Sequence, residues 1–190
     1  VAPKKGAWVI QNAANSGVGR AVIQLAPMLG LHTMNLVRRE PLFAELKALG
    51  ADHVLLDDTD AVDTAKEICG DARPSLALNA VGGDSALRLM NILGPGGFHV
   101  TYGAMARKPL KVPNGLLIFK DLRICGFWLT RWMKGAPAEE LAETYRRLAA
   151  GMAAGKLSLP VDSTHALSDF RQALARNDES GREGKVIFIP

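Results

Sequence analysis

Short apolar runs alternate with longer segments in which apolar residues recur at helical spacing, and this rhythm continues through the first hundred residues. The short runs predict buried strands, and the longer segments predict helices. Strands are expected at residues 7–13, 33–37, 53–56, 75–81 and 97–102, and helices at residues 16–29, 41–49, 61–69 and 84–93. Strands that alternate with helices in this way form βαβ units around a mainly parallel sheet, with right-handed crossovers.

Two local signals refine these helices. Pro27 lies inside the first one and is expected to kink it near its end, because proline lacks a backbone donor. Asp84 is expected to cap the N-terminus of the fourth helix.

The rhythm loosens after Gly103. A connector with a short apolar turn is expected over residues 109–120, then a sixth strand over 122–129 at a sheet edge, then a long amphipathic helix over 137–154. The tail begins near Leu157 and is expected to hold an extended segment at 157–161, a short helix at 166–175 and a last strand at 185–189. The pattern therefore divides the chain into a domain over residues 1–156 and a C-terminal tail over residues 157–190.

The first predicted strand runs directly into a turn of small residues, AANSGVG. Against the dinucleotide-binding pattern GxGxxG, Ala14, Ser16 and Gly19 occupy the glycine positions, and Gly17 is an additional glycine. Gly19 permits the helix to pack closely on the strand, while the helix N-terminus offers free N–H groups and partial positive charge to a phosphate. An ordinary strand-to-helix turn is the alternative. The position after the first strand of a βαβαβ run favours the pyrophosphate loop of a doubly wound Rossmann α/β domain.

The end of the second strand carries two arginines, Arg38 and Arg39. Dinucleotide folds that take NAD usually place a carboxylate there, about 20 residues after the glycines, on the ribose 2′-hydroxyl. A guanidinium group instead binds the 2′-phosphate of NADP through charge-assisted bonds. The alternative is a pair of solvated surface arginines, and Glu40 beside them weakens the signal. The pair nevertheless predicts NADP(H) as the cofactor.

Composition and charge exclude several classes of protein. With 190 residues, 48% hydrophobic and 22% charged, the chain has the usual mix of a globular domain. The net charge is +4, but basic neighbours occur only in pairs, which does not predict a nucleic-acid surface. No apolar stretch approaches the roughly 20 residues of a membrane helix, so no membrane partner is expected.

The two cysteines predict neither a metal site nor a disulfide framework. Cys69 and Cys125 are not part of a CxxC pair, and each lies next to apolar residues. Both are therefore expected to be buried free thiols, which fits a reducing compartment. The chain does not begin with Met and is expected to be a piece of a longer protein, with any targeting peptide outside it.

Several segments carry a resemblance to a known family. Residues 14–19 (ANSGVG) with 21–26 (AVIQLA) are similar to the zinc-free quinone reductase branch of the medium-chain dehydrogenases/reductases. The segments QNAANSGVG (11–19), NLVR (35–38), YGAM (102–105), LIFKDL (117–122) and GFWL (126–129) resemble mitochondrial-type trans-2-enoyl-CoA reductases. The resemblance covers nearly the whole chain.

The resemblance implies a set of residues around the cofactor. These are Asn15, Ser16, Gly17 and Val18 at the pyrophosphate, Arg38 and Arg39 at the 2′-phosphate, Tyr102, Gly103, Ala104, Met105, Phe127, Trp128, Leu129 and Thr130 at the nicotinamide, and Lys185 near the C-terminus. The YGAM segment also follows the fifth strand, at the sheet edge where such folds bind ligands. Core or interface aromatics remain the alternative for Phe127 and Trp128, and a solvated strand end for Lys185.

No catalytic residue is expected in this chain. The resemblance implies a catalytic domain built largely from residues before the cofactor domain, including a tyrosine as proton donor, and the tail is expected to return to that domain. Tyr102, Tyr145 and His165 do not replace this tyrosine. The expected function is hydride transfer from NADPH to an enoyl thioester, with quinone reduction or a non-catalytic dinucleotide-binding module as alternatives. The edge strand predicts a homodimer, and the location is expected to be cytoplasmic in a bacterium or mitochondrial in a eukaryote.

Overall fold

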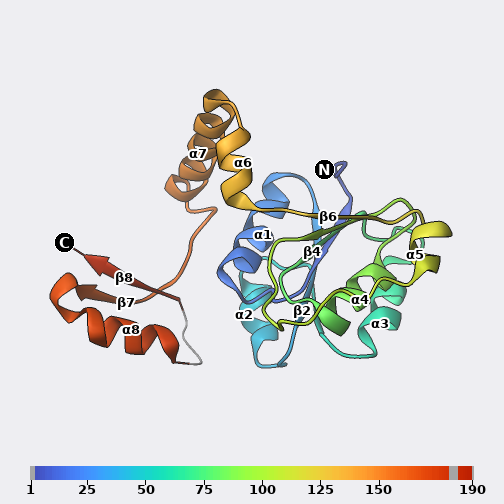
Figure 1. Cartoon of the computed structure of the whole chain (residues 1–190), viewed down its shortest axis with the longest axis horizontal. Helices are drawn as coiled ribbons and strands as arrows, with labels where there is room; N and C mark the ends of the chain where they lie inside the picture. Colours follow the sequence, from blue (N-terminus) through green and yellow to red (C-terminus); the bar gives the residue numbers. More distant parts are fainter. Residues whose placement is uncertain (1–2, 180–183, 190) are drawn as a thin grey trace.

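A six-stranded parallel sheet forms the centre of the molecule (Figure 1). The computed structural model describes residues 3–179 and 184–189. Within them the strand order is β3-β2-β1-β4-β5-β6, the order of a Rossmann fold, which confirms the predicted class. The strands are β1 (Trp8–Gln11), β2 (His32–Val37), β3 (His53–Leu56), β4 (Leu76–Asn79), β5 (Phe98–Thr101) and β6 (Arg123–Gly126).

Helices cover both faces of this sheet, as Figure 1 shows. The helices that follow the first four strands are α1 (Gly17–Met28), α2 (Leu42–Ala48), α3 (Ala61–Cys69) and α4 (Gly83–Ile92). One apolar cluster joins α1 and α2 to the sheet through Ile23 and Leu46, and a larger cluster joins α3 and α4 to the opposite face through Ala65 and Leu89. Burial of these stripes supplies the main driving force for folding.

The C-terminal third is less regular. It contains α5 (Asn114–Ile118), α6 (Leu129–Gly135), α7 (Ala138–Ala153), β7 (Val161–Ala166), the 3-10 turn η1 (Leu167–Asp169), α8 (Phe170–Asp178) and β8 (Lys185–Ile189). Strands β7 and β8 pair in parallel as a separate small sheet, with α8 as their crossover. None of the described helices is long and apolar enough to cross a membrane.

The structure corrects several local predictions. The predicted strand over 122–129 ends at Gly126, and Leu129 begins helix α6. The extended segment predicted at 157–161 is wrong, because the strand begins at Val161, where that prediction ends.

Helix α4 begins after Gly82, whose φ of 90° favours glycine, so Asp84 lies in the first turn rather than at the cap. The carboxylate of Asp84 forms an ion pair with Lys111 instead. Pro27 falls in the last turn of α1, next to its natural end.

The two thiols differ from one another. Cys69 is buried at the end of α3 as expected, and burial raises its pKa. Cys125 is exposed, which contradicts the prediction, because β6 is the last strand of the sheet and has a neighbour on one side only.

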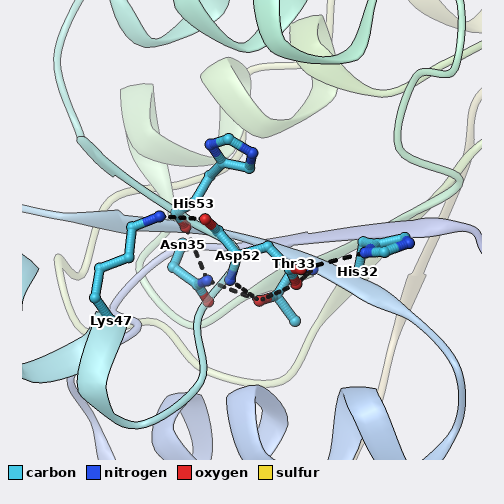
Figure 2. Close-up of polar contacts among 6 residues, drawn as sticks. All are labelled: His32, Thr33, Asn35, Lys47, Asp52 and His53. Atoms are coloured by element: carbon cyan, nitrogen blue, oxygen red, sulfur yellow. Dashed lines mark hydrogen bonds and ion pairs between the residues drawn. The ribbon is translucent and has the colours of Figure 1, made fainter.

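A polar cluster fastens the amino ends of β2 and β3, at the edge opposite the strand ends that bind ligands in such folds (Figure 2). The Asp52 carboxylate accepts a hydrogen bond from the Thr33 N–H at 2.8 Å and lies 3.2 Å from the His32 ring. Burial alone would raise the pKa of Asp52, but these bonds lower it overall. The Lys47 ammonium donates to the Asp52 carbonyl. This cluster stabilises the α2–β3 connection and is not part of the candidate site.

Candidate functional site

The turn between β1 and α1 is built around the absence of a side chain at Gly19. A Cβ there would lie 2.5 Å from the Ala14 carbonyl oxygen, closer than atoms tolerate. The Gly19 N–H donates to the Ser16 hydroxyl at 3.1 Å, and Ser16 caps α1. The notebook-style role of a donor to phosphate is thus limited for Ser16 by its role as the helix cap. No acidic residue lies in the first turn, so the positive end of the helix dipole is uncompensated.

This turn opens into a cavity of about 880 Å³, within the usual range for ligand sites. Its lining comes from α1, the end of β2, α2 and the tail: Asn15, Ser16, Gly17, Arg20, Arg38, Arg39, Leu42, Glu45, Leu159, Pro160, Glu179, Gly184 and Lys185. Six of these were predicted from the sequence. The cavity thus joins the small-residue turn, the two arginines and the C-terminal lysine, which are separated by more than a hundred residues in the chain.

Lys185 lies directly above the turn. A Cβ at Gly17 would be 3.3 Å from Lys185 Cε and 3.6 Å from Lys185 Nζ. The bare backbone of Gly17 therefore leaves room for the lysine stem. Together with Arg38 and Arg39, this ammonium makes the cavity strongly cationic.

The YGAM segment follows β5 at the same sheet edge. Tyr102 N–H donates to the Asn79 carbonyl at 3.0 Å, and the Gly103 position lacks room for a side chain, since a Cβ would lie 2.9 Å from the Ala80 oxygen. Burial raises the pKa of the Tyr102 hydroxyl, and the nearby Ser16 hydroxyl opposes the rise. The Tyr102 side chain thus reaches from β5 towards the turn before α1.

Other predicted residues lie outside the cavity lining. Val18 and Met105 are exposed, and Ala104 and Gly19 do not line it. Phe127, Trp128, Leu129 and Thr130 are all exposed at the junction of β6 and α6. The structure therefore does not bring this last group together with the arginines, and their role stays a prediction.

A buried polar network that the sequence did not reveal holds the carboxyl ends of β1 and β4 together. The Asn12 amide donates to Asn79 Oδ1 and to Ser85 Oγ, each at 2.8 Å. Asn79 Oδ1 also accepts from the N–H groups of Val81 and Gly82 at 3.1 and 3.0 Å. Such amides satisfy the backbone where the strand order reverses, and so fix the crevice between the two strands.

Arg20 is a second residue that sequence reasoning missed. Its Nε donates to the Asn15 carbonyl at 3.1 Å, and its guanidinium pairs with Glu45 of α2. A cation in the first turn of a helix is unfavourable for the dipole. That placement was the available signal that Arg20 serves the cavity instead.

Comparison with known proteins identifies the family. The model of the zinc-binding dehydrogenases matches residues 17–149. The chain belongs to this family. The result confirms the resemblance to medium-chain dehydrogenases/reductases and to the mitochondrial enoyl reductases.

A mitochondrial enoyl-[acyl-carrier-protein] reductase from Rattus norvegicus is 46% identical over 174 residues, which cover 89% of this chain and 47% of the relative. The chain thus spans about half the length of the curated relatives it matches.

Solved structures agree with the fold. The Etr1p/NADP/crotonyl-CoA complex matches with a TM-score of 0.84 and 28% identity, over 98% of this chain and 55% of that one. A mitochondrial 2-enoyl thioester reductase Etr1p/Etr2p heterodimer from Candida tropicalis matches with a TM-score of 0.80 and 28% identity, over 93% and 53%. A quinone oxidoreductase from Pseudomonas syringae pv. Tomato matches with a TM-score of 0.82 and 26% identity, over 99% and 58%.

The family name implies zinc, and the described residues do not fit such a site. Among residues 3–179 and 184–189, no three His, Cys, Asp or Glu side chains are grouped closely enough to hold a metal ion. Zinc sites need three or four such ligands around one point. A zinc-dependent role is therefore not assigned to this part of the chain.

Proposed function

We propose that this chain is the NADPH-binding part of an enoyl thioester reductase. The observation that carries the proposal is the cavity that joins Arg38 and Arg39 to the turn before α1. A 2′-phosphate distinguishes NADP from NAD, and guanidinium groups at the end of β2 are suited to bind it. The similarity to the Etr1p/NADP/crotonyl-CoA complex supports the same cofactor.

The residues present fit this cofactor. Gly17 and Gly19 leave the space that side chains would fill, and the N-terminus of α1 faces the cavity with uncompensated N–H groups. We assign the pyrophosphate to this turn and the 2′-phosphate to the arginines. Lys185 adds a further positive charge above Gly17.

The nicotinamide end is assigned to the strand ends beyond β5 and β6. Tyr102, Gly103, Ala104 and Met105 follow β5, and the segment from Phe127 to Thr130 follows β6. Both segments leave the carboxyl edge of the sheet, where such folds hold ligands. The Tyr102 hydroxyl is buried and available to fix the cofactor or Ser16.

Bound NADPH would supply the hydride that reduces the β-carbon of the enoyl group. The residues of this chain would hold and orient the cofactor, and the proton donor is expected in a segment outside it. We therefore propose that residues 1–156 are the cofactor domain and that residues 157–190 return towards a catalytic domain. The rat relative is named mitochondrial, which supports that compartment for a eukaryotic source.

Titration of the chain with NADPH and NADH tests the cofactor. Arg38→Gln should weaken NADPH binding by about tenfold to a hundredfold, because a charged hydrogen bond contributes roughly 1.5–3 kcal/mol, and should leave NADH binding nearly unchanged. Arg147→Gln, an exposed arginine on α7, is the matched control. Equal affinity of the unaltered chain for the two cofactors would refute the assignment.

A quinone reductase is the second candidate, supported by the similarity to the Pseudomonas syringae quinone oxidoreductase. Reduction of crotonyl-CoA and of a benzoquinone by the full-length parent distinguishes the two. NADPH binding without turnover of either substrate by that parent would favour a non-catalytic dinucleotide-binding module.

We also propose a homodimer in which β6 pairs with its copy. This strand is the last of the six-stranded sheet, and the exposed side chains of Phe127 and Trp128 follow it directly. An unpaired apolar edge favours pairing with another chain. The Candida tropicalis reductase is a heterodimer, so assembly in pairs occurs among the similar structures.

A further inference from the structure

Gln24 joins α1 to the tail across 134 residues of sequence. The side chain is almost fully buried, and its amide pairs with the backbone of Ser158 in both directions. Its Nε2 donates to the Ser158 carbonyl at 2.9 Å, and the Ser158 N–H donates to Gln24 Oε1 at 2.8 Å. The Ser158 hydroxyl donates to the same oxygen at 3.2 Å. The amide thus acts as one rung of a strand pair between a helix and the tail.

The clamped residue lies two positions before the pairing of β7 with β8. The Pro160 carbonyl accepts a hydrogen bond from Lys185 N–H at 2.9 Å. Gly184 permits this close approach, because a Cβ there would lie 2.4 Å from the Pro160 oxygen. The backbone of Lys185 is therefore fixed relative to Pro160, and Pro160 is held close to Gln24.

The Lys185 side chain needs such a constraint. Its ammonium lies near Gly17 at the positive end of α1, in a cavity that Arg20, Arg38 and Arg39 also line. Like charges repel, so without an anion this position is unfavourable for a long flexible lysine.

Apolar packing of Leu157 near Gly151 also holds this part of the chain, but such contacts are non-directional. The paired amide bonds of Gln24 give the tail a defined register instead.

We propose that Gln24 is a positioning residue: it holds Ser158, thereby keeps Lys185 above the phosphate-binding turn, and strengthens binding of the anionic cofactor without touching it. This inference rests on the proposed function, namely that the cavity binds NADPH. No similar role was suggested by the sequence, in which Gln24 is one polar residue on an otherwise apolar helix segment.

A double-mutant cycle on the 190-residue chain tests the proposal, with NADPH affinity measured by fluorescence titration. Lys185→Met should weaken binding by about tenfold, the loss of one charged hydrogen bond. Gln24→Met should weaken it by about threefold to tenfold. The double variant should bind no more weakly than Lys185→Met alone, because Gln24 acts through Lys185. Combined with Arg38→Gln, by contrast, Gln24→Met should multiply the loss.

Two variants control for the chemistry of the change. Gln172→Met makes the same substitution at an exposed glutamine on α8, and Ser158→Ala keeps both backbone partners of Gln24. Both should bind NADPH within about twofold of the unaltered chain. If Gln24→Met does not fold, Gln24→Asn, which keeps the amide but shortens its reach, takes its place in the cycle.

Folded Gln24 variants that bind NADPH as tightly as the unaltered chain would overturn the inference. A loss that multiplies with that of Lys185→Met would overturn it as well, since Gln24 would then act independently of the lysine. Both outcomes leave the proposed function intact. Absence of NADPH binding by the unaltered chain would instead overturn the proposed function, and this inference with it.

Discussion

His99 should make the stability of this domain sensitive to acid. The imidazole lies in β5, fully buried, and neither ring nitrogen has a hydrogen-bond partner among the described residues. Burial lowers its pKa from 6.5 to about 4, because the interior disfavours the charged ring. The unfolded chain therefore binds the proton more tightly than the folded chain. The stability is fully present above pH 6.5 and is lost as the pH falls towards 4.

The size of this loss follows from the shift. A difference of about 2.5 pKa units corresponds to roughly 3.4 kcal/mol over the whole interval, of which about 2 kcal/mol is lost by pH 5. His99→Leu removes the titrating group and two buried atoms without partners. The variant should be at least as stable as the unaltered chain at pH 7.5, and its stability should fall about 2 kcal/mol less between pH 7.5 and pH 5.

Chemical denaturation followed by circular dichroism at several pH values measures both slopes. His165→Leu, at a partly exposed imidazole, controls for the loss of a histidine in general. The difference between variant and unaltered chain cancels the carboxylates and His53, whose pKa is also lowered by burial. Identical slopes for His99→Leu and the unaltered chain would refute the reasoning.

Three further outcomes are expected. Gly19→Ala should lower stability by about 1–3 kcal/mol in thermal melts, because the new Cβ would meet the Ala14 oxygen at 2.5 Å, and an unchanged midpoint would contradict that contact. Sedimentation should give twice the chain mass, with Trp128 fluorescence protected from quenchers; a monomer with a freely quenched Trp128 would exclude pairing through β6. The chain alone should bind NADPH yet not reduce crotonyl-CoA, and turnover on the order of 1–10³ s⁻¹ would show that a catalytic group lies within it.

The Rossmann part could be predicted from the sequence because its information is local. Apolar periodicity gave the strands and helices through residue 102, and the spacing from Gly19 to Arg38 placed the arginines at the end of β2. The structure brings that strand end and the turn before α1 into one cavity. Small residues and chain spacing were sufficient there, since the βαβ unit fixes where each strand ends.

The remaining features depend on partners far away in the chain. Asn12 and Asn79 read as ordinary strand residues until the sheet places β1 beside β4. Gln24 meets Ser158 only when the tail folds back onto α1. The exposure of Cys125 follows from the edge position of β6, which a run of apolar letters does not reveal. Helix α6 likewise follows β6 within an apolar run that resembles one continuous strand.

The two walls of the cavity are held by different means, and this difference bears on how the cofactor would be bound. The wall of Arg38 and Arg39 ends a buried strand whose position is fixed by the sheet. The opposing wall, with Lys185, belongs to a small two-stranded sheet that reaches α1 through the Gln24 amide and nearby apolar contacts. Discrimination for the 2′-phosphate would therefore be built into the rigid wall, where geometry is set before binding. Total affinity would depend on the second wall as well, because any freedom of the tail is lost on binding and weakens the complex.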